Sequence, residues 1–98
     1  MSFAAFQEES RRLVILQCLS AAVQYRAALQ LVLSYCDAMG HVVGHDRIQA
    51  DLTWLRDSGL VTLATEGAVT VATLTSRGND VATGRTTVPG VHRPQPGA

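Results

Sequence analysis

The stretch IQADLTWLRDSGLVTLATEGAVTVATLTSRG, residues 48–78, decides the fold. In its first part, Ile48, Leu52 and Leu55 recur at intervals of four and three residues, which predicts an amphipathic helix over residues 46–58 that ends at Gly59. Two segments rich in Val and Thr, residues 60–65 and 68–75, follow with Glu66-Gly67 between them as the turn. The order therefore predicts a helix that leads directly into a β-hairpin.

Two more amphipathic helices are predicted before this stretch. The first covers residues 6–21, with Ser2 as the cap of an earlier start, and places Glu8 and Glu9 in its first turn. Residues 22–26 interrupt the pattern and suggest a short extended segment. The second helix covers residues 27–39 and stops at Gly40. The predicted buried faces consist of Leu13, Leu16, Leu19 and Val23, and of Leu29, Val32, Leu33, Cys36 and Met39.

The C-terminal part is predicted to hold one short helix and a tail. Thr75 or Ser76 can cap a helix that runs to residue 82, and the prolines at 89, 94 and 96 indicate a non-helical segment from Gly84 onward. A chain of 98 residues is long enough for one domain. We therefore expect an α+β domain over residues 1–83 and an extended basic tail over residues 84–98.

Composition limits the class of function. The chain has eight arginines, no lysine and eight acidic residues, so its formal net charge is zero, whereas a nucleic-acid binder usually shows a basic face. No apolar run is long enough for a membrane span and no secretory leader is evident, which favours a cytoplasmic protein. Cys18 and Cys36 lie in apolar helical patterns and are interpreted as buried free thiols.

Two groups of residues resemble a known class of regulators. Leu52-Thr53-Trp54-Leu55 leading to Gly59-Leu60-Val61, and Leu74-Thr75-Ser76-Arg77-Gly78, are similar to winged-helix proteins of the broad MarR, ArsR and PadR type. The whole chain, with residues 11–16 and the tail residues 88–94, resembles a small winged-helix protein of Mu-like phages and prophages. The resemblance implies a winged helix-turn-helix with a three-helix core, a two-stranded wing, a short C-terminal helix and an extended tail, acting in a bacterial host cell.

In that fold, the helix over residues 46–58 would enter the major groove of duplex DNA. Gln49 and Thr53 would meet base edges, with Arg47 and His45 near the start of the helix. The expected phosphate contacts are Arg56, Arg77 and Arg26. The alternative interpretation is a solvated surface interrupted by Asp46, Asp51 and Asp57. Trp54 is expected to pack against the hairpin or the start of the first helix.

The sequence also favours some roles over others. We expect no enzyme, cofactor, metal site or small-molecule effector, because no nucleophile motif, phosphate loop or ligand cluster is evident, and the three histidines are scattered. The metal-sensing ArsR branch carries paired cysteines on its third helix, and residues 46–58 contain none. A homodimer is expected, because Phe3, Phe6, Leu31 and Tyr35 exceed what one small core buries. The neutral charge and the acid at the hairpin tip favour a different role, a protein-binding module in phage assembly or host takeover.

Overall fold

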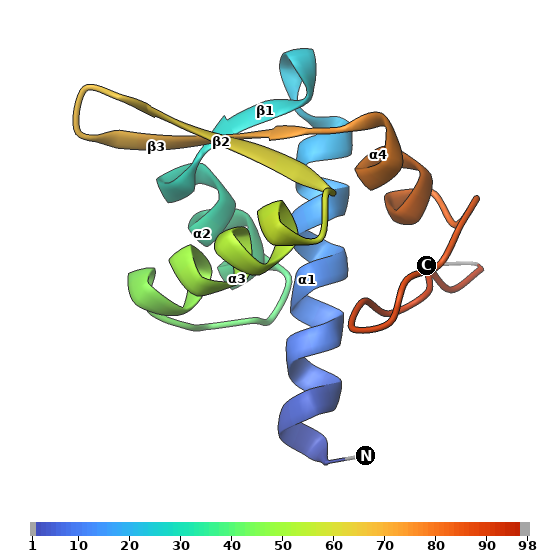
Figure 1. Cartoon of the computed structure of the whole chain (residues 1–98). Helices are drawn as coiled ribbons and strands as arrows, with labels where there is room; N and C mark the ends of the chain where they lie inside the picture. Colours follow the sequence, from blue (N-terminus) through green and yellow to red (C-terminus); the bar gives the residue numbers. More distant parts are fainter. Residues whose placement is uncertain (1, 97–98) are drawn as a thin grey trace.

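The computed structural model describes residues 2–96 and shows a mixed α+β fold, which is compatible with a winged helix (Figure 1). Helices α1, α2 and α3 lie on one side of an antiparallel sheet, with α4 and the tail beside α1 (Figure 1). In chain order the elements are α1 (Phe3–Ala21), η1 (Val23–Tyr25), β1 (Arg26–Ala28), α2 (Leu29–Ala38), α3 (His45–Asp57), β2 (Val61–Glu66), β3 (Val69–Leu74) and α4 (Ser76–Ala82).

Helix α1 begins earlier than its main apolar pattern indicates. The Ser2 side chain accepts a hydrogen bond from the Ala5 amide at 3.0 Å, so the predicted Ser2 cap is confirmed. The placement of Glu8 and Glu9 in the first turn is therefore wrong, since the helix begins at Phe3. Val23 is also not buried, because α1 ends at Ala21 and Val23 lies in the 3-10 turn η1 with 85% of its surface exposed.

The sheet has three strands in the order β1-β3-β2, so the expected two-stranded wing omitted β1. The hairpin itself is confirmed, with Val61 opposite Leu74 and Glu66 opposite Val69. Strand β1 pairs with β3 through only three residues, which are too few to give an alternating pattern in the sequence. Because β1 takes residues 26–28, helix α2 begins at Leu29 rather than at residue 27.

One hydrophobic core joins the helices to the sheet. Leu52 and Leu55 of α3 are fully buried together with Leu60, and Leu74 of β3 is 8% exposed. The third helix and the hairpin therefore share one interior, as the sequence predicts. Met39 is an exception to the predicted stripe of α2, since it is 53% exposed where the helix ends and the chain turns at Gly40.

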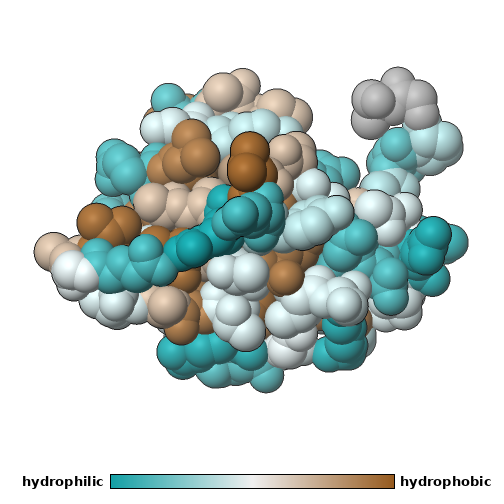
Figure 2. Space-filling view, turned by 90° about the horizontal axis from the view of Figure 1, so that it is seen from above, coloured by the Kyte–Doolittle hydropathy of each residue, from teal (hydrophilic) through white to brown (hydrophobic). Residues whose placement is uncertain are grey.

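The outer face of the sheet is not covered by any helix among the described residues (Figure 1). Ala27 of β1 points toward the core, so the neighbouring Arg26 points to the outer face. There Arg26 forms an ion pair with Glu66 at the hairpin tip. Viewed from above, a strip of hydrophilic residues (teal) crosses this face, with hydrophobic (brown) and intermediate (pale) surface on both sides of it (Figure 2).

The tail returns along α1 instead of leaving the domain. Val91 is buried in the core, and the His92 amide donates to the Glu9 carbonyl at 3.2 Å. Arg12 donates to the Gly90 carbonyl at 3.0 Å. Gly90 has a φ of 93°, and a Cβ there would lie 2.6 Å from the Trp54 ring, so a glycine is required. The tail thus closes one side of the core.

No helix within residues 2–96 is both long and apolar enough to cross a membrane.

A close contact joins the end of α3 to the start of α4. The Thr75 hydroxyl donates to the carbonyls of Gly59 and Leu60, at 2.9 and 3.0 Å, and accepts a hydrogen bond from the Gly78 amide at 3.0 Å. A Cβ on Gly78 would overlap the Leu60 carbonyl and lie 2.7 Å from Leu74 Cδ1. Gly78 is therefore needed for close approach, although its backbone is ordinary helix.

We expect Gly78→Ala to lower the free energy of unfolding by about 3 kcal/mol. The cost of overpacking outweighs the stability that alanine usually adds to a helix. Gly67→Ala is the matched control, since Gly67 has a φ of 66° but open space around it. The control should lose only about 1–2 kcal/mol, the cost of a left-handed alanine. Urea denaturation measures both, and an equal or smaller loss for Gly78→Ala would contradict the close approach.

Both cysteines are buried and free, as predicted. Burial raises the pKa of the Cys18 thiol, and burial followed by the charges of Cys18 and Asp51 raises the pKa of Cys36 to about 12. Both thiols therefore stay protonated near neutral pH, and a protonated thiol is a poor nucleophile.

We expect neither thiol of the folded protein to react with a disulfide reagent such as DTNB at about pH 8, which lies below the raised pKa of Cys36. Two thiols should react at once in denaturant, since unfolding removes the burial that raises both pKa values. Absorbance of the released thiolate counts them. Rapid reaction of one thiol in the native state would show that its site opens to solvent.

Candidate functional site

The outward face of α3 is fixed by its buried stripe. Ile48, Asp51, Leu52 and Leu55 are buried, and successive residues advance by about 100° around a helix. Residues 46, 50 and 57 therefore lie opposite the core, where two of the three are aspartates. The predicted base-reading residues flank this acidic line on both sides.

One flank of α3 carries His45, Gln49, Thr53 and Arg56. The Thr53 hydroxyl donates to the Gln49 carbonyl at 3.0 Å, so it is already used within the helix. Arg56 Nε lies 3.2 Å from Asp57 Oδ1, and His45 Nδ1 lies 3.8 Å from Asp46 Oδ1. Arg56 and the His45 ring therefore each have an adjacent carboxylate.

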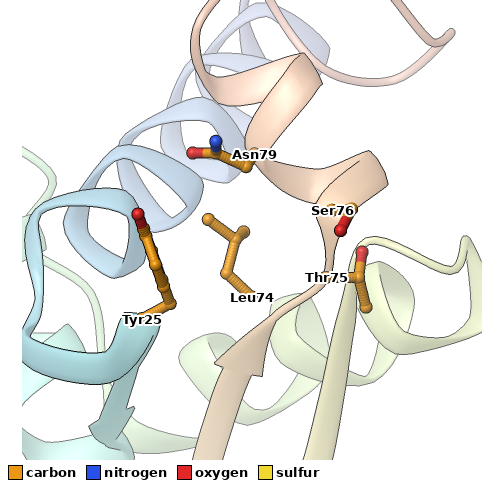
Figure 3. Close-up of a pocket in the computed structure, with 5 residues that line it drawn as sticks. All are labelled: Tyr25, Leu74, Thr75, Ser76 and Asn79. Atoms are coloured by element: carbon orange, nitrogen blue, oxygen red, sulfur yellow. The ribbon is translucent and has the colours of Figure 1, made fainter.

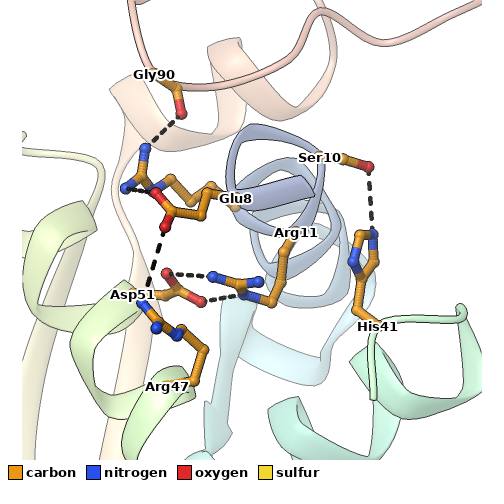
Figure 4. A network of polar contacts seen from close by, with 8 residues as sticks. Glu8, Ser10, Arg11, His41, Arg47, Asp51 and Gly90 are labelled. Atoms are coloured by element: carbon orange, nitrogen blue, oxygen red, sulfur yellow. Dashed lines mark hydrogen bonds and ion pairs between the residues drawn. The ribbon is translucent and has the colours of Figure 1, made fainter. Parts of the chain in front are cut away.

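Arg47 lies on the other flank, next to α1. Its Nη1 atom is 3.9 Å from Glu8 Oε1, and the other oxygen of Glu8 is 3.5 Å from Arg12 Nη2 (Figure 4). Glu8 thus lies between one arginine of α1 and one of α3. Arg47 and Gln49 are separated by the acidic line and do not form one cluster.

The two expected phosphate contacts outside α3 differ in their position relative to it. Arg26 is on the outer face of the sheet, whereas α3 packs on the opposite, inner face. Arg77 donates to the Ser58 carbonyl at 2.6 Å. This carbonyl lies at the C-terminal end of α3, where the helix dipole favours a nearby cation. The structure therefore separates Arg26 from the readout residues, whereas Arg77 lies at the C-terminal end of α3.

Asp51 differs from the sequence interpretation, which placed it on the solvated face. Its side chain is 4% exposed and forms a buried ion pair with Arg11 of α1, whose Nη2 lies 3.2 Å from Asp51 Oδ1. The sequence contains a signal for its burial, because Asp51 lies at helical spacing from Ile48, Leu52 and Leu55, on the same face of the helix. A carboxylate in a buried stripe requires a cation partner, and Arg11 supplies it.

Ser10 and His41 lie beside this ion pair (Figure 4). Ser10 Oγ is 3.2 Å from His41 Nε2. Burial, and then the charge of Arg11, lower the pKa of His41, while Asp51 opposes the shift. The two Asp51 oxygens accept hydrogen bonds from Arg11. The arrangement is a structural link between α1 and the loop after α2.

Trp54 packs against α1, as predicted. The Arg12 guanidinium carbon lies 4.1 Å from the centre of the Trp54 ring, a cation–π contact. Arg12 also binds Glu8 and the Gly90 carbonyl, so it joins α1, α3 and the tail. Its buried Nε has no hydrogen-bond partner among the described residues.

A shallow pocket lies at the other end of α1. Tyr25, Leu74, Thr75, Ser76 and Asn79 line it, with a volume of about 240 Å³ (Figure 3). Asn79 Oδ1 accepts a hydrogen bond from Ser20 at 2.8 Å. The pocket is smaller than the ligand sites of about 300–1,000 Å³ that bind drug-sized molecules. Within residues 2–96, no group of three or more His, Cys, Asp or Glu side chains could hold a metal ion.

These features define a small α+β protein with a helix-and-hairpin arrangement and a charge-balanced outer surface. It is 45% identical over 91 residues to Uncharacterized protein gp26 of Escherichia phage Mu, and the match covers 92% of this chain and 93% of gp26. The chain therefore belongs to the family of Mu gp26. It is also 33% identical to an uncharacterized protein of Haemophilus influenzae, over 79% of this chain and 76% of that protein.

No family model matches the chain. No solved structure matches it either. The relationship to gp26 of phage Mu supports the interpretation of this chain as a phage protein.

The buried ion pair gives a direct test of how α3 is anchored. We expect Asp51→Leu alone, or Arg11→Met alone, to lower the free energy of unfolding by about 3–5 kcal/mol, because each leaves an unpaired buried charge. The double variant should recover most of this loss. Urea denaturation of the four proteins gives the coupling energy.

Arg26→Ala is the control, since its partner Glu66 is exposed and such pairs contribute about 0–1 kcal/mol. Additive losses from the two core substitutions would contradict the pairing of Arg11 with Asp51.

Proposed function

We propose that this chain is a small winged-helix-like interaction module of a Mu-like phage or prophage, acting in the bacterial cytoplasm. Its exposed α3 surface, with the adjoining hairpin, binds another protein involved in phage assembly or host takeover. The observation that carries the proposal is the neutralisation of the surface expected to bind DNA. Each of its four arginines lies beside a carboxylate or binds a backbone carbonyl.

Electrostatics supports this choice. Affinity for duplex DNA comes largely from phosphates neutralised by Lys and Arg, and the α3 surface has Asp46 and Asp57 at its centre. A phosphate backbone docked there would meet carboxylates. Protein interfaces, in contrast, commonly carry both signs of charge around a less polar centre. Alternating charges also suit recognition of one defined partner.

DNA binding remains a second candidate, in the role of a transcription-regulator-like module. Arg47 and Arg56 are half exposed, and their ion pairs are of the surface kind that contributes about 0–1 kcal/mol. Such pairs could be exchanged for phosphate contacts at low cost. Gln49 would then be placed to read a base edge.

Fluorescence anisotropy with a labelled duplex of mixed sequence separates the two candidates. The protein-binding proposal predicts a dissociation constant weaker than about 10⁻⁴ M even at low salt, outside the usual range of non-specific DNA binders. Asp46→Asn with Asp57→Asn should create measurable affinity, because it removes the repulsive charges. Tight binding by the unaltered protein that weakens steeply with salt, and is lost in Arg47→Ala but not in Arg85→Ala, would overturn the proposal in favour of DNA.

A second measurement tests the partner directly. The tagged chain is expressed in cells carrying an induced Mu-like prophage and captured after chemical cross-linking. We expect a discrete protein adduct that survives nuclease, is lost with Asp46→Lys and Asp57→Lys, and persists with Arg85→Ala. Adducts that disappear on nuclease treatment would instead indicate a nucleic-acid partner.

A further inference from the structure

The turn between α1 and β1 takes a backbone conformation that its residues disfavour. The Arg26 amide donates a hydrogen bond to the Val23 carbonyl. Between them, Gln24 and Tyr25 each have a φ of 58°, and they are the only non-glycine residues with a positive φ within residues 2–96. This is a type I′ turn, whose two left-handed positions usually hold Asn, Asp or Gly because other side chains are strained there. Backbone strain of this kind clusters at binding sites, where a side chain is held for a purpose.

Burial in the core does not explain the choice of tyrosine. Tyr25 is 52% exposed, so little of the strain is offset by burial of its ring. The side chain forms one wall of the pocket of about 240 Å³, beside Leu74, with Asn79 and Ser76 also around it (Figure 3). The strained turn therefore holds an aromatic ring at the edge of a pocket.

The pocket contains hydrogen-bonding groups that the fold does not use. Asn79 Oδ1 accepts a hydrogen bond from Ser20, which leaves the Nδ2 group of the same amide as a donor. This group and the hydroxyls of Tyr25 and Ser76 form no hydrogen bond within residues 2–96, whereas the Thr75 hydroxyl is fully engaged. None of the five side chains that line the pocket is charged. Its chemistry is thus one aromatic face, one apolar contact and several uncharged polar groups.

We propose that this pocket binds a small, uncharged planar ring with carbonyl oxygens on its edge, the chemistry of a pyrimidine base. The Tyr25 ring provides a face for stacking and Leu74 an apolar contact, which together select a flat ligand. The Asn79 Nδ2 group and the two unused hydroxyls donate to the ring carbonyls. The volume suits a single ring, because a cavity of about 150 Å³ holds a benzene-sized molecule.

An anionic ligand fits the pocket poorly. Phosphates and carboxylates are usually held by Arg or Lys, and neither type lines the pocket. The arginines next to it in the sequence are engaged elsewhere, since Arg77 donates to the Ser58 carbonyl and Arg26 pairs with Glu66. The ring itself is therefore the group that is recognised. Free nucleosides and single-stranded nucleic acid both carry such a ring, and the probes below distinguish these sources.

Titration of the isotope-labelled full chain with uridine, followed by amide NMR shifts, tests the proposal. We expect saturable shifts at Tyr25, Ser76 and Asn79 with a dissociation constant in the millimolar range or tighter. Dihydrouridine keeps both carbonyls but loses the flat aromatic ring, so it should bind about tenfold more weakly. Uridine monophosphate should bind no more tightly than uridine. Binding of the monophosphate alone would show an anion site and would overturn the proposal.

Two neighbouring substitutions separate the ring from the turn that carries it. Tyr25→Gly removes the ring but suits the left-handed backbone, so the fold should persist while the shifts caused by uridine are lost. Gln24→Gly is the matched control, because it relieves strain at the other left-handed position and keeps the ring. It should raise the midpoint of thermal unfolding and leave the affinity for uridine unchanged. Unchanged binding in Tyr25→Gly, or equal loss in both variants, would refute stacking on this ring.

A single-stranded oligouridylate distinguishes the two sources of the base. Affinity per base equal to that of uridine identifies a free nucleoside as the ligand, whereas tighter binding that Tyr25→Gly abolishes identifies a strand. Both results support a base in the pocket, and the absence of shifts with every probe overturns it. The measurements use no variant of α3 and no partner protein. Their failure would therefore leave the proposed α3 interface unaffected, and failure of that interface would leave the pocket unaffected.

Discussion

The structure depends on how closely the chain returns to itself where α3 ends. Gly59 takes a left-handed backbone, and the Leu60 amide bonds back to the Leu55 carbonyl at 2.9 Å, which ends the helix and aims the chain into β2. Thr75, at the far end of the hairpin, binds the same turn through its hydroxyl. Helix, hairpin and α4 are therefore fixed to one another at a single point, which only a residue without a side chain at position 78 can close.

The closely packed junction of α3, the hairpin and α4 fixes the backbone that carries the charged residues of α3. The backbone of α3 is also tied to α1 by the buried pair of Arg11 and Asp51 and by Arg12 on Trp54. Arg47 and Arg56 therefore start from fixed backbone positions beside Glu8 and Asp57. A mixed α+β arrangement that is compatible with a winged helix does not by itself assign DNA binding, since function follows the chemistry of the site. Here that chemistry is balanced in charge.

The sequence predicted elements with strong periodicity and missed those set by tertiary contact. The leucines of α3 and the Ser2 cap each have a local cause and are confirmed, whereas the hairpin turn is displaced by one residue, to Gly67 and Ala68, because Glu66 still pairs with Val69 as the end of β2. Strand β1 exists because β3 offers it a free edge, which three residues of sequence do not reveal. Asp51 was assigned to solvent because its partner lies 40 positions away in the sequence. For the same reason, the separation of Arg26 from α3 by the sheet became evident only in three dimensions.

Helix α1 explains how so small a domain can hold a complete core and still leave aromatic side chains exposed at one end. Its central residues are buried on nearly every side, by α2, by α4 and by the tail through Val91. Its first turns extend past these neighbours, and there Phe6 meets the rings of Phe3 and His92. Glu8 lies at the boundary and binds arginines of both α1 and α3. Phe6 and Glu8 are two positions apart and so point to nearly opposite sides of the helix, which keeps the exposed rings separate from the side of α1 that faces Arg47.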